Sequence, residues 1–354
     1  MPMKFLITVC LAVSGIILQA QDSARKHTFS LGGFIECYYK TALQAAAGAD
    51  PEFFLYNFRK QQQPRLNLAL VKSSYSGKNI KANIALMAGD YSQYNLAAEP
   101  GLLQHVFEAS INISISKKWS ADAGILPSHI GLESAIGKDN WNTSRSLLAE
   151  NSPYYETGIK LNFQATGRLS IAALLLNGWQ HIKDNNSYPA WGTQVQYRAG
   201  KSWLLNSSTF IGRENAGNAA AMRLFHNLYA TGAVAKKWNA AFLFDIGFQK
   251  RTGNNGYAQW LGTGALVQYT ISSRFKAAGR AEYFKDSEQV LVATGTAHGF
   301  NTASFSVSAD YSPAEHILLR AEIRSYTGKD AIFSHNLKPA TGMGNVLFAA
   351  SYWF

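Results

Sequence analysis

The feature that most constrains this chain is an alternation of apolar and polar residues that runs from residue 29 to Phe354. Successive side chains of a strand point to opposite faces, so the alternation indicates two-faced strands. Clusters of Gly, Asn, Ser and Lys, which are typical of turns, separate the alternating segments. We count sixteen such segments, at 29–40, 64–75, 79–91, 104–116, 118–128, 153–166, 168–180, 190–199, 201–212, 223–235, 237–250, 258–271, 274–285, 299–312, 315–327 and 342–354.

Each segment has one apolar and one polar face. In the fourth segment, Phe107, Ile111 and Ile113 share one face, whereas Glu108 and Asn112 share the other. A soluble sandwich also alternates, but this many two-faced strands around one dry core would make an unusually large one. A membrane barrel requires an apolar outside and a polar inside. The predicted fold is all-β: a transmembrane, antiparallel, up-and-down β-barrel of about 16 strands.

The connections between segments fall into two classes. Short turns, such as those before Trp119, Leu169 and Trp238, alternate with longer polar connections. Outer-membrane barrels have short periplasmic turns and longer external loops, and aromatic girdles at both interfaces. Trp, Tyr and Phe fall mostly near the ends of the segments, as such girdles require. An even number of strands places both termini on the same side of the membrane.

The N-terminus carries a targeting signal. Residues 1–20 contain one basic residue, Lys4, then an apolar run at 5–18, and end on the small residue Ala20. This is the pattern of a secretory signal peptide. No later apolar run approaches the ~20 residues that a spanning helix needs. We expect a signal peptide at 1–20 and a single β-barrel domain at 21–354, in the outer membrane of a Gram-negative bacterium.

The end of the chain is the most specific signal for this localisation. Val346, Phe348, Ala350, Tyr352 and Phe354 occupy every second position, and the sequence stops at the phenylalanine. Such an aromatic, lipid-facing end resembles the C-terminal signal that the outer-membrane barrel assembly machinery reads. We therefore expect Tyr352 and Phe354 to form an assembly signal, with membrane lipid and that machinery as partners.

The chain is basic, with a formal charge of +11, of which Lys4 supplies one. Lys and Arg are scattered one or two to a strand or turn, without a basic stripe, so we expect no nucleic-acid partner. Of the two cysteines, Cys37 alone lies beyond the signal peptide, on the predicted lipid face, so an intrachain disulfide cannot form. A cationic lumen fits the charge better.

Ionisable residues gather on the polar face of neighbouring strands. Because residues two apart in a strand point the same way, these side chains form a charged wall. Such a wall can set the ion preference of a pore. Alternatively, its charges neutralise each other and fix the barrel shape. The pore-lining candidates are Arg280, Glu282, Asp310, Arg320, Glu322, Arg324 and Lys160.

The stretch from Pro127 to Gly158, after the fifth predicted strand, contains the longest break in the alternation. Long connections without regular structure are usually functional. Its charged residues are interspersed with apolar ones such as Ile130 and Leu147, which indicates packing against the barrel wall. We expect a loop that folds into the lumen as a constriction, with an external plug or lid as the alternative. The constriction candidates are Glu133, Lys138, Asp139, Arg145 and Glu150.

Ser128 and His129, with Asp139 or Glu133 nearby, invite a comparison with outer-membrane phospholipases. Adjacent residues of an extended segment point to opposite sides, so Ser128 and His129 cannot act as nucleophile and base without a special turn. His129 and Glu133 have a spacing that suits a metal on a helix, but a third ligand is missing. We therefore expect no catalytic site, metal or cofactor.

Several stretches of the chain carry a family resemblance, among them Gly124 to Gly131, Ser144 to Tyr154, Gly279 to Tyr283 and Leu319 to Glu322. They resemble the OmpL-like β-barrel porin family of Bacteroidetes-type bacteria, and the resemblance spans nearly all of the chain beyond the signal peptide. It implies an outer-membrane barrel of porin type. It supplies no substrate and no catalytic residues.

The sequence as a whole favours passive diffusion of small hydrophilic solutes through the barrel, with a preference for anions. The first alternative is a barrel with a plugged lumen that does not conduct and serves as a surface receptor or scaffold. The second is a membrane enzyme similar to a phospholipase. The sequence leaves the solute and the pore radius undetermined, and it leaves a homotrimer open as an assembly.

Overall fold

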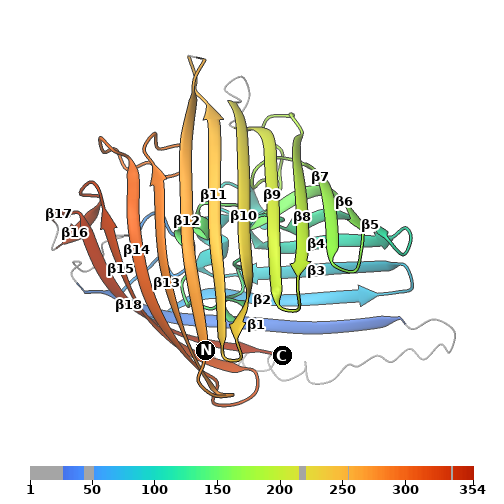
Figure 1. The fold of residues 1–354 in the computed structure, drawn as a ribbon, viewed down its shortest axis with the longest axis horizontal. Coiled ribbons are helices and arrows are strands. Elements are labelled where there is room, and N and C mark those ends of the chain that lie inside the picture. Colours follow the sequence, from blue (N-terminus) through green and yellow to red (C-terminus); the bar gives the residue numbers. More distant parts are fainter. Residues whose placement is uncertain (1–26, 44–51, 215–220, 254, 336–337) are drawn as a thin grey trace, which may run out of the picture.

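The computed structural model describes residues 27–43, 52–214, 221–253, 255–335 and 338–354, so the expected signal peptide lies outside the described residues. Sixteen strands of this part of the chain close into one antiparallel barrel (Figure 1). Each strand pairs with its neighbours in the chain, and β1 also pairs with β18, which closes the barrel. The barrel strands are β1 (Thr28–Ala42), β2 (Arg65–Ser76), β3 (Ile80–Ala88), β4 (Val106–Ser114), β5 (Trp119–Pro127), β6 (Tyr155–Gln164), β7 (Leu169–Leu176), β8 (Ala190–Ala199), β9 (Trp203–Glu214), β10 (Ala221–Ala235), β11 (Trp238–Lys250), β12 (Tyr257–Thr270), β13 (Phe275–Asp286), β14 (Phe300–Tyr311), β15 (Ile317–Gly328) and β18 (Gly342–Trp353).

The predicted fold class is confirmed, and most strand boundaries agree within a few residues. Larger differences occur in the third and seventh segments, where β3 ends at Ala88 and β7 at Leu176. Gly89 explains the first of these. Its φ of 124° is one that other residues rarely adopt, and an added Cβ would meet the backbone of Asn67. The chain therefore leaves the sheet at Gly89 and enters a short helix.

Short elements occupy some of the longer connections. They are α1 (Asp90–Asn95) and η1 (Gly101–His105) after β3, η2 (Gly137–Asp139) and α2 (Leu147–Glu150) after β5, and the two-stranded sheet of β16 (Phe333–His335) and β17 (Lys338–Ala340) after β15. The Ser146 side chain caps α2 by accepting a hydrogen bond from the backbone N–H of Ala149. In the described part of the chain, no helix has the length and apolar character to cross a membrane.

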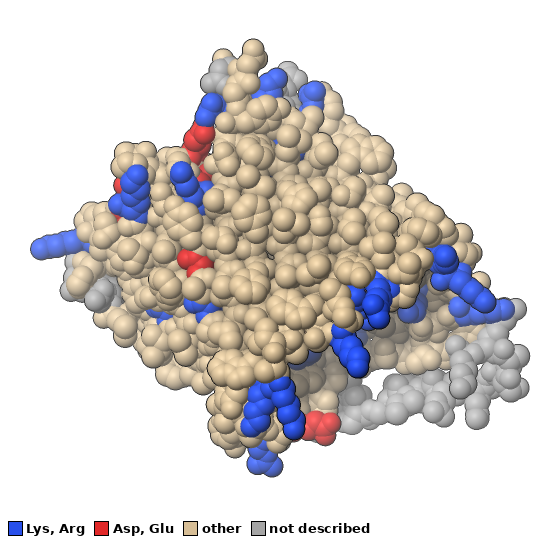
Figure 2. Space-filling view, viewed as in Figure 1, with Lys and Arg blue, Asp and Glu red and all other residues tan. Residues whose placement is uncertain are grey.

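The alternation sorts side chains between the two faces as predicted. Ile111, Phe305 and Phe348 are exposed on the outside, as is Cys37, whereas Glu108 is buried on the inside. Figure 2 shows a broad uncharged belt on one outer face, with most Lys and Arg side chains towards its edges. Stacked or tilted ring pairs on adjacent strands border the short turns, each with centroids 4.5 Å apart: Trp119 with Phe163, Trp238 with Tyr269, and Phe275 with Tyr311. These features are those of a lipid-facing belt with an interfacial girdle.

The inward face departs from the polar pattern in one region. An apolar core joins inward-facing side chains of the strands, among them Phe210, Phe225 and Trp260, to residues of the connections, such as Phe54 and Leu148. This part of the wall therefore differs from the polar inner face that the alternation predicts. The reason is that the connections supply apolar partners, so these side chains lose their contact with water.

Candidate functional site

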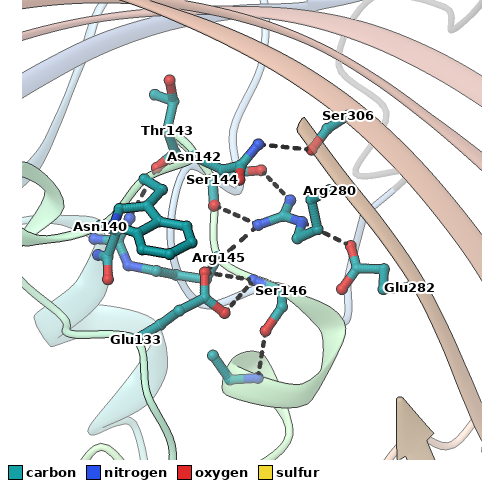
Figure 3. Close-up of polar contacts among 12 residues, drawn as sticks. Glu133, Asn140, Asn142, Thr143, Ser144, Arg145, Ser146, Arg280, Glu282 and Ser306 are labelled. Atoms are coloured by element: carbon teal, nitrogen blue, oxygen red, sulfur yellow. Dashed lines mark hydrogen bonds and ion pairs between the residues drawn. The ribbon is translucent and has the colours of Figure 1, made fainter. Parts of the chain in front are cut away.

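The connection between β5 and β6, residues 128–154, is called the β5–β6 loop below. It contacts inward-facing side chains of strands far from β5 in the barrel order (Figure 3). The backbone N–H of Ser144 donates to the Glu322 carboxylate of β15 at 3.1 Å, and that of Leu147 donates to the Glu282 carboxylate of β13 at 2.5 Å. α2 also packs against β11, β12 and β13.

Arg280 of β13 is at the centre of these contacts. Its guanidinium donates to the backbone carbonyl of Ser144 at 2.7 Å and to the Ser144 hydroxyl at 2.9 Å. Three carboxylates lie within ion-pair distance: Glu282 at 3.1 Å, Glu133 of the loop at 3.5 Å and Glu322 at 3.8 Å. Figure 3 shows Arg280 facing the loop backbone, with Glu133 contributed from the loop side. One cation is thus shared between the wall and the loop.

Arg324 of β15 joins the same network. Its guanidinium forms an ion pair with Glu282 at 2.5 Å and donates to the backbone carbonyl of Arg145 at 2.9 Å and to the Ser144 hydroxyl at 3.0 Å. It also lies 4.5 Å from the ring centroid of Tyr326, a cation–π distance.

Arg320 holds the part of the loop that contains η2. It pairs with Asp310 of β14 at 2.8 Å. The same guanidinium donates to the backbone carbonyls of Gly137 at 2.8 Å, Asn140 at 2.9 Å and Trp141 at 2.9 Å. Arg320 therefore links the barrel wall to three peptide groups of the loop.

The structure places the predicted wall residues on the inward face, but it buries most of them beneath the loop. The side chains of Arg280, Arg320 and Arg324 are at most 1% exposed, and Glu282 and Glu322 are equally buried. Removing one partner of such a buried pair leaves the other charge without compensation, which is strongly destabilising. Lys160 is separate from this network, on β6, where its ammonium donates to Gln194 at 3.1 Å.

The constriction candidates have different environments within the loop. Arg145 is buried and donates to the carbonyls of Ser134, Ala135 and Thr143, so it braces the loop internally. Glu133 accepts from the N–H of Ser146. Lys138 and Asp139 pair with each other at 2.8 Å and are partly exposed, and the Lys138 ammonium lies 5.5 Å from the Trp353 ring centroid.

Glu150 joins the β5–β6 loop to a second connection, residues 52–63 between β1 and β2, called the β1–β2 segment below. Its carboxylate accepts from the backbone N–H of Tyr56 at 2.6 Å and from the Asn57 amide at 3.0 Å. Burial raises the pKa of the Glu150 carboxyl above its usual value of 4.5, although these hydrogen bonds oppose the shift.

The β1–β2 segment is a part of the site that the alternation pattern did not indicate. Its Glu52 is buried in an ion pair with Lys40 and accepts from the Tyr326 hydroxyl at 2.8 Å and the Asn345 amide at 2.9 Å. Phe54 packs into the apolar core. The run of apolar residues from Phe53 to Leu55 was the available signal, because it resembles the apolar residues that singled out the β5–β6 loop.

Glu36 of β1 faces Gly137 of the loop. The side chain is 1% exposed, and neither carboxylate oxygen has a hydrogen-bond partner among the described residues. A Cβ atom added at Gly137 would overlap this carboxylate. Glycine therefore permits the loop to approach the wall this closely.

The residues that suggested catalysis or metal binding have other partners. His129 contacts the Glu156 carboxylate at 2.8 Å and the backbone carbonyl of Thr209 at 2.9 Å, and the Ser128 hydroxyl accepts from the N–H of Ile130. Ser128 and His129 are not bonded to each other in the hydrogen bonds of the described residues. Nor does that part of the chain contain a cluster of three or more His, Cys, Asp or Glu side chains that could hold a metal.

The last residue is anchored to the first strand. Phe354 exchanges two backbone hydrogen bonds of 3.2 Å with Gly33, and its ring lies over Gly33, where a Cβ would overlap it. The rings of Tyr352 and Phe354 are both exposed, with centroids 6.2 Å apart. The predicted aromatic end thus forms part of the outer surface at the β1–β18 closure.

A closed barrel of sixteen described strands, with an apolar outer belt and a long connection bound to its inner wall, defines the porin class of outer-membrane proteins. The chain belongs to the family described as "Putative beta-barrel porin-2, OmpL-like", whose model matches residues 28–354. The resemblance to the OmpL-like β-barrel porin family is therefore confirmed, as is the outer membrane of a Gram-negative bacterium as the location.

Solved structures of other porins share the fold. The outer membrane channel DcaP of Acinetobacter baumannii has a TM-score of 0.63 at 10% identity, over 93% of this chain and 97% of that one. An anion-selective porin from Comamonas acidovorans has a TM-score of 0.60 at 11% identity, over 93% and 100%. Salmonella typhi OmpF has a TM-score of 0.58 at 10% identity, over 92% and 97%. No curated protein sequence matches the chain.

Proposed function

We propose that small hydrophilic solutes diffuse passively through this porin, along a lumen that the β5–β6 loop and the β1–β2 segment constrict. The observation that carries the proposal is the set of hydrogen bonds from Arg280, Arg320 and Arg324 to the loop backbone. A loop held at this many points by buried side chains is rigid, so it would define a fixed opening rather than a mobile lid.

We further propose a preference for anions that depends on Lys160 rather than on the wall arginines. The arginines are buried and paired, so their field at the pore axis is largely cancelled by the neighbouring carboxylates. Lys160 has no such carboxylate partner in the ion pairs of the described residues. The chain also carries a formal charge of +11, which favours anions near its surface.

A barrel that does not conduct is the second candidate, because an apolar core joins the connections to the inner wall. Leu148, Trp179, Phe225 and Trp260 belong to this core, and such packing would suit a receptor or scaffold with a plugged lumen. An enzymatic role receives no support from Ser128 and His129, whose hydrogen bonds lead to different partners.

A homotrimer is our proposal for the assembly. It is supported by the trimer form of OmpT from Vibrio cholerae, a structurally similar barrel with a TM-score of 0.59 at 10% identity. Chemical cross-linking in isolated outer membranes tests it. A ladder that ends at three copies is the expected result, and a monomer at every cross-linker concentration would contradict it.

Solute flux into proteoliposomes tests the proposed transport. We expect a monosaccharide to enter rapidly and a tetrasaccharide to be excluded, because the constriction limits solute size. In a salt gradient, Lys160→Gln should move the reversal potential towards cations, while Arg251→Gln, at an exposed ion pair with Glu288, should not. A folded barrel that admits neither sugar would favour the receptor or scaffold instead.

A further inference from the structure

A polar cavity of about 330 Å³ lies at the short-turn end of β4 to β8. Lys117 and Lys118 of the β4–β5 turn and Lys160 of β6 line it, together with serine hydroxyls and side-chain amides. No Asp or Glu of the described residues belongs to this lining. In a barrel with short periplasmic turns, this is the periplasmic end. The cavity thus carries three cations and no counter-charge of its own.

Lys160 differs from the inward-facing Lys40 and Lys72, each of which pairs with a carboxylate. It lies opposite Asp122 in the strand register, but the Asp122 carboxylate accepts from the amides of Asn112 at 2.7 Å and Asn162 at 2.6 Å. Within the described residues, the Lys160 ammonium has no carboxylate within 4.0 Å and donates only to Gln194, at 3.1 Å. By contrast, the inward-facing Lys72 pairs with Glu108 at 2.6 Å.

We propose that this cavity is a binding site for a small oxyanion, a phosphate or carboxylate group, with the Lys160 ammonium as its charged ligand. An ammonium has three N–H donors, and Gln194 takes one of them, which leaves two for the oxygens of an anion. The hydroxyls of Ser120 and Ser170 line the same cavity and can donate as well. Its volume lies in the range of small-molecule sites, roughly 300–1,000 Å³.

Lys117 and Lys118 have a different role in the proposed site. They belong to the exposed β4–β5 turn at the mouth of the cavity, so they would raise the local concentration of anions without ordering them. The inference rests on the proposed porin function, because an anion must reach the cavity through the lumen or the periplasmic opening. It names the class of solute that the passage would favour.

Calorimetric titration of the folded barrel in detergent tests the site, with inorganic phosphate, acetate and ammonium chloride as probes. We expect saturable binding of phosphate or acetate and none of ammonium. Lys160→Gln should weaken the binding about tenfold, the effect of losing a charge-assisted hydrogen bond. The matched control is Lys276→Gln, the same change of charge at a residue of a separate cavity near Asp310. Wild-type protein that binds neither anion, or Lys160→Gln binding as well as wild type, would overturn the proposal.

Chemical footprinting of lysines on the wild-type protein tests the same site without a variant, so it does not require Lys160→Gln to fold. Phosphate should slow the acetylation of Lys160 relative to Lys276, as read by mass spectrometry, and equal protection of both would overturn the site. Conductance distinguishes this inference from the proposed function. A barrel that binds phosphate but does not conduct contradicts the porin function alone, whereas a barrel that conducts without binding contradicts the oxyanion site alone.

Discussion

A buried guanidinium stabilises a fold only when its donors and its charge both find partners, and Arg324 meets this condition. Glu282 supplies the charge, and the Arg145 carbonyl with the Ser144 and Ser304 hydroxyls supply the remaining acceptors. The alternation of the sequence predicted that Arg324 faces inward. It contained no information about the loop carbonyl that binds it, because that contact joins residues distant in sequence.

Truncation of Arg324 should therefore destabilise the barrel strongly. Arg324→Ala leaves the buried Glu282 carboxylate short of a partner, and breaking a buried ion pair costs about 3–5 kcal/mol. Urea unfolding of the refolded barrel, followed by tryptophan fluorescence, measures the change in the free energy of unfolding. Arg251→Ala, which breaks the exposed pair with Glu288, is the control and should have no measurable effect. Equal losses in the two variants would show that burial of Arg324 is not what makes it stabilising.

Glu150 should give the barrel a pH-dependent stability. Burial raises the pKa of this carboxyl in the folded protein above 4.5, so in the window above pH 4.5 the folded state holds a proton that the unfolded state releases. The contribution of Glu150 to stability therefore falls as the pH rises through that window. The difference in urea midpoint between wild type and Glu150→Gln should shift in favour of the variant from pH 4 to pH 8. A difference in urea midpoint that stays the same from pH 4 to pH 8 would contradict the raised pKa of Glu150.

The β5–β6 loop lies very close to the barrel wall at Gly137, where the backbone approaches the Glu36 carboxylate. Gly137→Ala should displace the loop or the buried Glu36 side chain, because its Cβ would overlap the Glu36 carboxylate, and overpacking of this kind costs about 1–3 kcal/mol. The measurement is the urea midpoint together with the rate of proteolysis within the loop. Gly167→Ala, at a turn with open space around the added Cβ, is the matched control.

A second substitution tests the cause of that effect. Glu36→Ala removes the carboxylate that the new methyl group would meet, so the double variant Gly137→Ala with Glu36→Ala should lose less stability than the two single effects together. Strict additivity of the two changes would mean that the loop is displaced for another reason.

The sequence predicted the β5–β6 loop but not the β1–β2 segment, for a physical reason. A long break in a two-residue alternation is visible in the chain itself, as the stretch around Arg145 demonstrates. The β1–β2 segment shows only a short apolar run, from Phe53 to Leu55, and its position depends on its partners. The Glu150 carboxylate binds its backbone, and Tyr326 and Asn345 bind Glu52. Those contacts depend on how two connections pack together, which local periodicity does not determine.

The barrel as a whole was predictable because the membrane imposes the pattern. Every strand must present an apolar face to lipid, so strand number, order and phase all appear in the sequence. The inward faces carry no such requirement. Phe225 and Trp260 are apolar there because the connections cover them, and this could not be inferred before the connections were placed.

Assembly of the whole barrel should depend on its last residue. Deletion of Phe354 removes an exposed aromatic ring and the two backbone hydrogen bonds with Gly33 at the β1–β18 closure. We expect secretion to continue and insertion into the outer membrane to fall, as measured by the amount of heat-modifiable, protease-resistant barrel. Phe354→Tyr keeps the ring and the backbone and should assemble normally. If the variant that lacks Phe354 gave wild-type amounts of folded barrel, Phe354 would have no role in assembly.

Single-channel recording in planar bilayers, with wild type beside a variant in which a short Gly-Ser linker replaces residues 134–144, tests the constricted pore most directly. We expect stable, small conductance steps from wild type. The variant should give larger steps, because the short linker no longer fills the part of the lumen that residues 134–144 occupy. The variant must first migrate as a folded, heat-modifiable barrel. Two folded barrels with equal steps, or with none, would contradict a lumen that conducts solutes past this loop.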